Sequence, residues 1–126
     1  MLFLTLSEVI EIHAQSIEEF GGTHGLRDVG ALASALTAAE NRAFYEQAGL
    51  AVCAATYAYH LSQAHAFLDG NKRIAASATE IFLLINNARL QMTNTEIVAF
   101  FLEIAAGSLT REQVEQFFGG RVFLTG

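Results

Sequence analysis

The order of hydrophobic and polar positions along the chain is typical of helices. Three four-residue steps each match a capping box, in which the side chains at the two ends of the step accept hydrogen bonds from amides that a helix start leaves unpaired. These steps are Thr5 with Glu8, Thr93 with Glu96, and Thr110 with Gln113. An apolar pair flanks each step, as in a hydrophobic staple. We therefore predict that three helices begin directly after these threonines.

Further helices are expected between these starts. Asp28 follows a glycine-rich turn and can cap a helix that runs to about Ala38. The segments Leu50–Gln63 and Ile74–Ile85 are apolar almost all round and rich in Ala and Leu, which indicates buried helices. The pattern predicts an all-α bundle of about six helices in a single domain, residues 1–126. Any strand should be confined to short pieces such as Asn41–Glu46.

Composition narrows the class of protein. At 126 residues, the chain is long enough to bury roughly two-thirds of its unfolded surface. Its one cysteine, Cys53, excludes an internal disulfide and fits a reducing cytoplasm. A net charge of −6 with scattered cations argues against broad nucleic-acid binding. Since the chain has neither a basic leader nor an apolar run of membrane-spanning length, we expect a cytoplasmic protein that binds no membrane.

The stretch HAFLDGNKRIAA, residues 65–76, joins the two buried helices and collects residue types that are otherwise scarce. Lys72 is the only lysine of the chain, and Asp69 is one of two aspartates. A helix N-terminus can hold a phosphate, and a bound anion would compensate for the unfavourable placement of Lys72 and Arg73 at the positive end of the dipole. Asp69 offers a carboxylate oxygen for Mg²⁺, and His65 can accept a proton from a hydroxyl.

Two other residues of this stretch have a predicted structural part. Gly70 has no Cβ and lets the backbone approach an anion closely. Phe67 should turn inward and anchor the loop. A Walker A phosphate loop is excluded, because Asn71 separates this glycine from the lysine and no glycine stands five residues earlier.

The stretch HAFLDGNKR resembles the signature H-x-F-x-D/E-G-N-x-R of the Fic/Doc family. The lysine before the arginine resembles the Doc (death-on-curing) branch, whose members are toxins of toxin–antitoxin pairs. Upstream, SEVIEIH, EEFGGTHGLRD and LASAL also resemble this branch, as does IFLLINN downstream. The resemblance covers most of the chain, the last fifteen residues least, and it implies a Fic/Doc-like helical fold.

The resemblance also implies an activity, the transfer of a phosphate-containing group from a nucleotide to a hydroxyl of a protein. His65 would deprotonate the hydroxyl, Asp69 would hold Mg²⁺, and Arg73 would neutralise charge as the bond breaks. The residues expected around the phosphates are Gly70, Asn71, Lys72 and Arg73. The donor would be ATP or another nucleoside triphosphate.

Which group is transferred depends on one position. AMP-transferring members usually carry a second glycine where Lys72 stands, and many carry a further arginine where Ala76 stands. The resemblance to Doc-like members implies a nucleotide bound in reverse, with its terminal phosphate presented to the target. A Doc-like kinase is therefore the first interpretation, with AMP transfer and an inactive antitoxin-binding module as alternatives. Ala66 replaces a proline common in the family and removes no chemical group.

The partners follow from the same resemblance. The Doc branch is associated with elongation factor Tu and arrested translation. The inhibitory signature S/T-x-x-x-E-G/N is absent from the sequence, so the antitoxin is expected to be a separate protein. Ala39–Gln47 stands where the family places a flap, a short strand or hairpin that pairs with an extended target segment.

Other polar residues are expected to be structural. His13 should lie on a helix face, His24 in a turn, and His60 among packed side chains. Arg27 and Asp28 should form a cap and an ion pair, and Glu80 could share the helix face of Arg73 and steady it.

Overall fold

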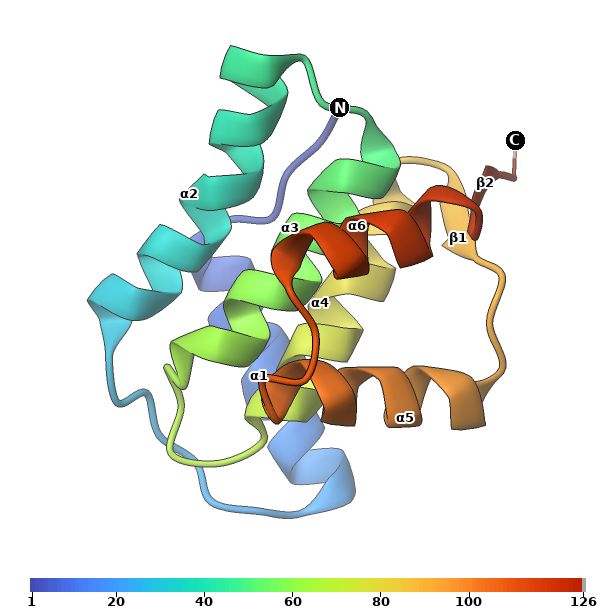
Figure 1. Ribbon diagram of the computed structural model, residues 1–126. Coiled ribbons are helices and arrows are strands. Elements are labelled where there is room, and N and C mark those ends of the chain that lie inside the picture. Colours follow the sequence, from blue (N-terminus) through green and yellow to red (C-terminus); the bar gives the residue numbers. More distant parts are fainter. Residues whose placement is uncertain (126) are drawn as a thin grey trace.

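Six helices make up most of residues 1–125, the part of the chain that the computed structural model describes (Figure 1). The helices are α1 (Leu6–Phe20), α2 (Val29–Glu46), α3 (Leu50–Ala64), α4 (Asn71–Ile85), α5 (Asn94–Ala105) and α6 (Arg111–Gly119). Two short strands, β1 (Ala88–Leu90) and β2 (Val122–Leu124), pair antiparallel. The all-α prediction is confirmed.

The helix starts lie where the capping pattern placed them. Thr5, Thr93 and Thr110 each accept a hydrogen bond from the amide three residues on, and the side chain of that residue accepts one from the threonine amide. Asp28 Oδ1 accepts a hydrogen bond from the Ala31 amide at 3.0 Å. Local sequence alone therefore fixes four of the helix N-termini in this fold.

The end of α2 corrects two predictions. Asn41–Glu46 is not a strand, and the helix does not stop near Ala38, because α2 continues to Glu46. Within this extension the Arg42 guanidinium pairs with Glu46 one turn later and with Glu115 of α6. The predicted flap, Ala39–Gln47, is therefore the last two turns of α2 and its left-handed cap, not a connection between helices.

Helix α3 lies at the centre of the molecule, between α2 and α4 and against α5 and α6 (Figure 1). This central position explains why α3 is apolar all round, since its residues are buried on every side. Tyr57 packs on Phe82 of α4 and accepts a hydrogen bond from the Leu4 amide at 3.1 Å. Burial raises the pKa of the Tyr57 hydroxyl to about 12.

Two connections lie together at one end of the bundle, at the bottom of Figure 1. The α1–α2 connection pairs with the α3–α4 connection through an antiparallel bridge between Leu26 and Phe67. The Arg27 amide donates to Ala66 at 2.7 Å, and the Leu68 amide donates to Gly25 at 3.0 Å. The predicted site loop is thus bound along its length to a segment some forty residues upstream. Among the described helices, none combines the length and the apolar character needed to cross a membrane.

Candidate phosphate-transfer site

The backbone of the loop turns at two left-handed residues. His65 closes α3 with φ 47° and ψ 44°, and Gly70 opens α4 with φ 74° and ψ 21°. A Cβ on Gly70 would lie 3.3 Å from Ile17 and 3.5 Å from His13 of α1. Glycine is therefore favoured here by its left-handed conformation, and a Cβ would also be a tight fit against Ile17.

Asn71 holds the loop closed. Its side-chain oxygen accepts from the Phe67 amide at 3.0 Å, and its side-chain nitrogen donates to the Phe67 carbonyl at 2.9 Å. Both ends of the side-chain amide are thus committed to the loop backbone. The main-chain N–H of Asn71, at the start of α4, is free of these hydrogen bonds and can face a phosphate.

Phe67 turns inward as expected and is 2 % exposed. Its ring stacks on the ring of His13, with centroids 3.7 Å apart and planes 11° apart. The Nε2 atom of His13 lies 2.7 Å from the Asp69 carbonyl oxygen, which accepts a hydrogen bond from it. The sequence placed His13 only on a helix face, and its buried contact with a loop fifty-odd residues away carries no local signal in the sequence.

The Asp69 carboxylate is exposed and is oriented by backbone amides. One oxygen accepts from the Thr23 amide at 3.0 Å and the other from the Gly70 amide at 2.8 Å. These two hydrogen bonds, with a smaller effect from Arg73, lower the pKa of the carboxyl. The carboxylate is therefore ionised and points away from the core.

Gly22 makes this arrangement possible. A Cβ on Gly22 would lie 2.7 Å from the Asp69 carboxylate and 3.1 Å from the Arg73 guanidinium, and its φ is 122°. Any other residue would displace the Asp69 carboxylate and crowd the Arg73 guanidinium, in a conformation that L residues avoid. The EEFGGTHG segment is thus a wall of the site, a part that the sequence did not predict.

Most of the predicted site residues line one cavity of about 430 Å³. Its lining consists of Ser62, His65, Leu68, Asp69, Gly70, Asn71, Lys72, Leu102, Ala105 and Ala106. His65 and Lys72 are both exposed. The cavity therefore brings together a group that can accept a proton, a carboxylate, and a cation at a helix N-terminus.

Arg73 lies apart from this lining. Its guanidinium donates to the Gly21 carbonyl at 2.8 Å and lies 6.0 Å from the centre of the Phe20 ring. One hydrogen bond uses one of its five N–H donors, so the others remain free to bind an anion next to Asp69. The structure thus places the Arg73 guanidinium beside Gly21 and near Asp69, and Lys72 in the lining of the cavity.

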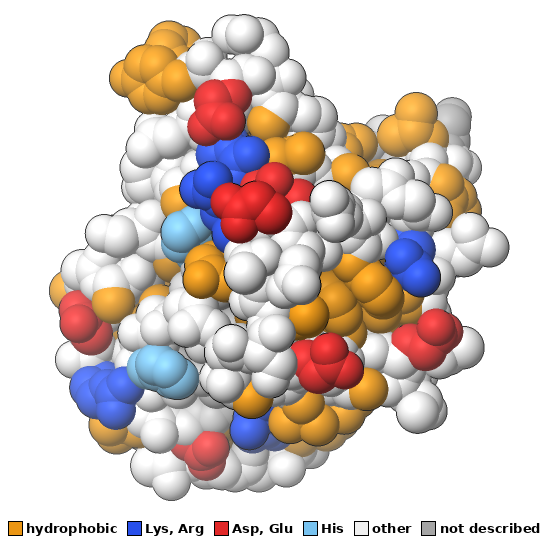
Figure 2. Space-filling model, in the orientation of Figure 1, with side chains coloured by type: hydrophobic (Ala, Val, Ile, Leu, Met, Phe, Trp, Pro, Cys, Tyr) orange, Lys and Arg blue, Asp and Glu red, His pale blue; other side chains and the backbone are white. Residues whose placement is uncertain are grey.

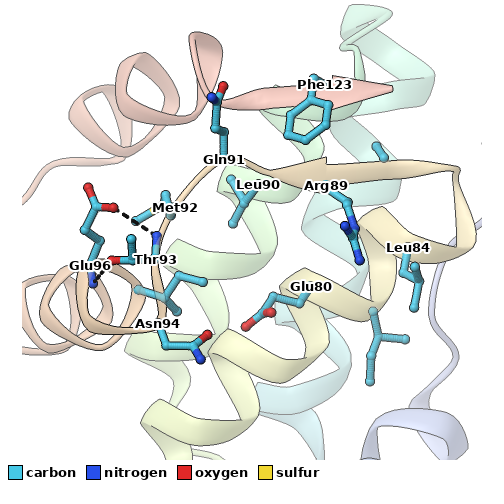
Figure 3. Close-up of a pocket in the computed structure, with 13 residues that line it drawn as sticks. Glu80, Leu84, Arg89, Leu90, Gln91, Met92, Thr93, Asn94, Glu96 and Phe123 are labelled. Atoms are coloured by element: carbon cyan, nitrogen blue, oxygen red, sulfur yellow. Dashed lines mark hydrogen bonds between the residues drawn. The ribbon is translucent and has the colours of Figure 1, made fainter. Parts of the chain in front are cut away.

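Glu80 does not steady Arg73. It points into a second cavity of about 680 Å³ between α4, β1 and the start of α5, together with Arg89 (Figure 3). Although Glu80 is exposed, partial desolvation of its carboxyl there raises its pKa. Thr93 and Glu96, joined by their capping-box hydrogen bonds, line another part of this cavity.

The remaining polar residues contribute to structure. Burial lowers the pKa of His60, as for a packed imidazole. His24 lies in the turn, 2.6 Å from Glu18. Asp28 caps α2 as predicted. The predicted ion pair between Arg27 and Asp28 is wrong, because the Arg27 guanidinium donates to the His65 carbonyl instead.

The surface charge and the side chains able to bind a metal ion limit which ligands fit this protein. Charged side chains of both signs are spread over the face drawn in Figure 2, and its largest group of cations lies among acidic side chains. Within residues 1–125, no three His, Cys, Asp or Glu side chains gather as a metal centre. Asp69 is a lone carboxylate, which suits a Mg²⁺ ion that also binds substrate phosphates better than it suits a metal held by protein alone.

Comparison with known proteins agrees with the motif. The model of the Fic/DOC family matches residues 3–83, which is more than half of the chain and includes the whole loop. The chain belongs to the Fic/DOC family. It is also 27% identical over 115 residues to the protein named "Protein kinase doc" of Escherichia phage P1, covering 90% of each chain. The loop formed by residues 65–73 lies within the matched range.

Proposed function

We propose that this Fic/DOC protein is a Doc-like kinase that transfers a phosphate from ATP, or another nucleoside triphosphate, to a hydroxyl of a target protein. The observation that carries the proposal is the convergence of His65, Asp69 and Lys72 on one cavity at the N-terminus of α4. The similarity to the phage P1 protein, which bears the name of a kinase, favours phosphate transfer.

The chemistry needs few groups. His65 takes the proton of the target hydroxyl, whose oxygen forms a bond to the terminal phosphorus. The bond from that phosphorus to the bridging oxygen breaks, and the nucleoside diphosphate leaves. The free N–H groups of the first turn of α4, Lys72 and the donors of Arg73 stabilise the charge on the phosphate oxygens.

Asp69 is suited to Mg²⁺. Each of its oxygens accepts one backbone N–H, which leaves lone pairs that can bind a cation. Because its pKa is lowered, the carboxylate is charged at neutral pH. Mg²⁺ bound there would neutralise phosphate charge and orient the donor.

The biological setting of the proposal rests on the Doc resemblance. The protein would act in the cytoplasm as the toxin of a toxin–antitoxin pair, restrained by a separate antitoxin. Elongation factor Tu is the proposed target, and its modification would arrest translation.

Labelled ATP tests the proposal directly. The protein is incubated with bacterial lysate, Mg²⁺ and ATP labelled at either the γ or the α phosphate. Transfer of γ label to a protein supports the kinase, and transfer of α label would show AMP transfer, the second candidate. Transfer of neither label would favour an antitoxin-binding module.

His65→Ala is the matched control. We expect it to abolish transfer while nucleotide still binds, because the histidine acts on the hydroxyl and not on the phosphates. Full activity of the variant would remove His65 from the mechanism.

A further inference from the structure

His65 is held through its backbone rather than through its side chain. The imidazoles of His13 and His24 are each oriented by a hydrogen bond, with the Asp69 carbonyl and with Glu18. Within residues 1–125, the hydrogen bond that a side chain makes to His65 reaches its carbonyl oxygen and not its imidazole, which is exposed. A general base needs a fixed direction towards the proton that it takes. For His65, this direction comes from the backbone that carries the side chain.

The backbone at His65 is in the left-handed region. Its φ is 47° and its ψ is 44°, and it is one of three residues other than glycine with a positive φ in the described part of the chain. Residues with a Cβ keep this conformation where surrounding contacts hold it. His65 is also the C-cap of α3, where helix carbonyls lack partners, and the last turn of α3 has no Lys or Arg to bind them. A partner from another segment is therefore needed.

Arg27 and Asp28 supply these partners. The Arg27 guanidinium donates to the His65 carbonyl. The amides of Arg27 and Asp28 both donate to the Ala66 carbonyl, at 2.7 Å and 3.0 Å. Asp28 is itself fixed, because its side chain caps α2. Three hydrogen bonds thus join the start of α2 to the consecutive carbonyls of His65 and Ala66.

The contact of Arg27 is with the backbone of the site and not with its cavity. Arg27 does not line the candidate-site cavity, and it lies 38 residues before His65 in the sequence. Its guanidinium is planar and holds its N–H donors in a fixed geometry, so the bond to the carbonyl restrains the rotation of that peptide group. The peptide group and the Cα–Cβ bond of His65 share one Cα atom. A turn of the carbonyl therefore also changes where the imidazole points.

We infer that Arg27 is a positioning residue, which holds His65 in the orientation from which the imidazole takes the proton of the target hydroxyl. The inference rests on the proposed function, in which His65 is the base. It adds a residue that lies outside the HAFLDGNKR signature. It also gives the α1–α2 connection a second part in the site, besides the wall that Gly22 forms.

The kinetics of label transfer test this role. Rates of γ-label transfer are measured against ATP concentration, with the purified lysate protein that takes up the label. We expect Arg27→Ala to lower kcat about ten- to a hundredfold, as for a displaced catalytic group, and to change the KM for ATP less than about twofold. Arg27→Lys keeps one donor and should lose less. Guanidinium ions at millimolar concentration should restore part of the kcat of Arg27→Ala and none of that of His65→Ala.

Arg89→Ala is the matched control. Arg89 is also an exposed arginine, but it points into the second cavity together with Glu80 (Figure 3), so the variant should keep the parental kcat. A second measurement does not depend on transfer. The NMR resonance of the His65 Cε1–H, identified by its loss in His65→Ala, should move in Arg27→Ala and stay in place in Arg89→Ala. A melting curve and a calorimetric titration with ATP and Mg²⁺ check that the Arg27→Ala protein is folded and that its phosphate site is intact.

Three results would overturn the inference. If Arg27→Ala keeps the parental kcat, Arg27 does not position the base. If kcat and ATP affinity fall together without rescue by guanidinium ions, Arg27 serves the phosphates or the fold. If the His65 resonance does not move, the contact with the carbonyl does not reach the imidazole. A parent protein that transfers neither label would overturn the proposed function and the catalytic part of the inference, while a moved His65 resonance would still show that Arg27 holds the backbone of His65.

Discussion

The Asp69 carboxylate accepts two backbone hydrogen bonds, and these hold its pKa below the ordinary value. The charged form therefore contributes stability at pH values above the unfolded pKa of about 3.9, and this contribution is lost as the pH falls through the lower folded pKa. We predict that Asp69→Asn melts at a lower temperature than the parent from about pH 5 to 8, and that the difference shrinks in more acidic solution. Melting curves at a series of pH values measure it. A difference that stays constant down to about pH 2 would show that the charge of Asp69 does not stabilise the loop.

Lys72 is the only lysine and the only cation of the cavity lining. If it stabilises a phosphate in the transition state, Lys72→Gly should lower γ-label transfer by about one to three orders of magnitude. Lys72→Arg keeps the positive charge, so its rate of γ-label transfer should fall less than that of Lys72→Gly. Transfer by the glycine variant at the parental rate would remove the main argument for a kinase over an AMP transferase.

At the level of elements, α1 supports the loop through His13, which stacks on Phe67 and binds the Asp69 carbonyl. We predict that His13→Ala lowers the free energy of unfolding by about 2–4 kcal/mol, because it removes a buried ring and leaves a carbonyl unpaired. His13→Phe keeps the ring and should recover part of this loss. Urea denaturation measures both variants. Equal stability of the alanine and phenylalanine variants would show that stacking contributes little.

The sequence predicted those elements whose signals are local. Capping boxes at Thr5, Thr93 and Thr110 lie within four residues, and the observed helices begin there. The β1–β2 pair and the bridge between Leu26 and Phe67 were not predicted, because each joins segments more than thirty residues apart. The predicted strand at Asn41–Glu46 was wrong, because α2 continues through these residues.

Within the candidate site too, local signals could be predicted from the sequence and contacts between distant segments could not. The motif predicted that His65, Asp69 and Lys72 would act together, and one cavity contains all three. It could not predict Gly22 or His13, whose contacts depend on how α1 lies against the loop. Residues that hold a site from a distant segment have no periodicity or spacing by which a single sequence could identify them.

At the scale of the whole molecule, α2 and α6 are joined across the bundle by one ion pair. Arg42 Nη1 lies 2.5 Å from Glu115 Oε1, and both side chains are largely buried. Glu115 raises the pKa of Arg42 through this hydrogen bond. The exposed Glu46 lies 3.0 Å from Arg42 Nε but lacks the alignment of a hydrogen bond. The cross-bundle partner should therefore matter more than the local one.

Two glutamate variants test this difference. Glu115→Ala leaves a largely buried guanidinium short of its main partner, so we predict a loss of about 1–3 kcal/mol in the free energy of unfolding. Glu46→Ala removes an exposed partner one turn away on the same helix and should cost at most about 0.5 kcal/mol. Urea denaturation of both variants measures the two losses. The slope of the unfolding free energy against urea concentration should be the same in both variants and the parent, which shows that the unfolded state has not changed. Equal losses would mean that the end of α2 is stabilised within its own helix, and that contact with α6 does not explain why the predicted flap is helical.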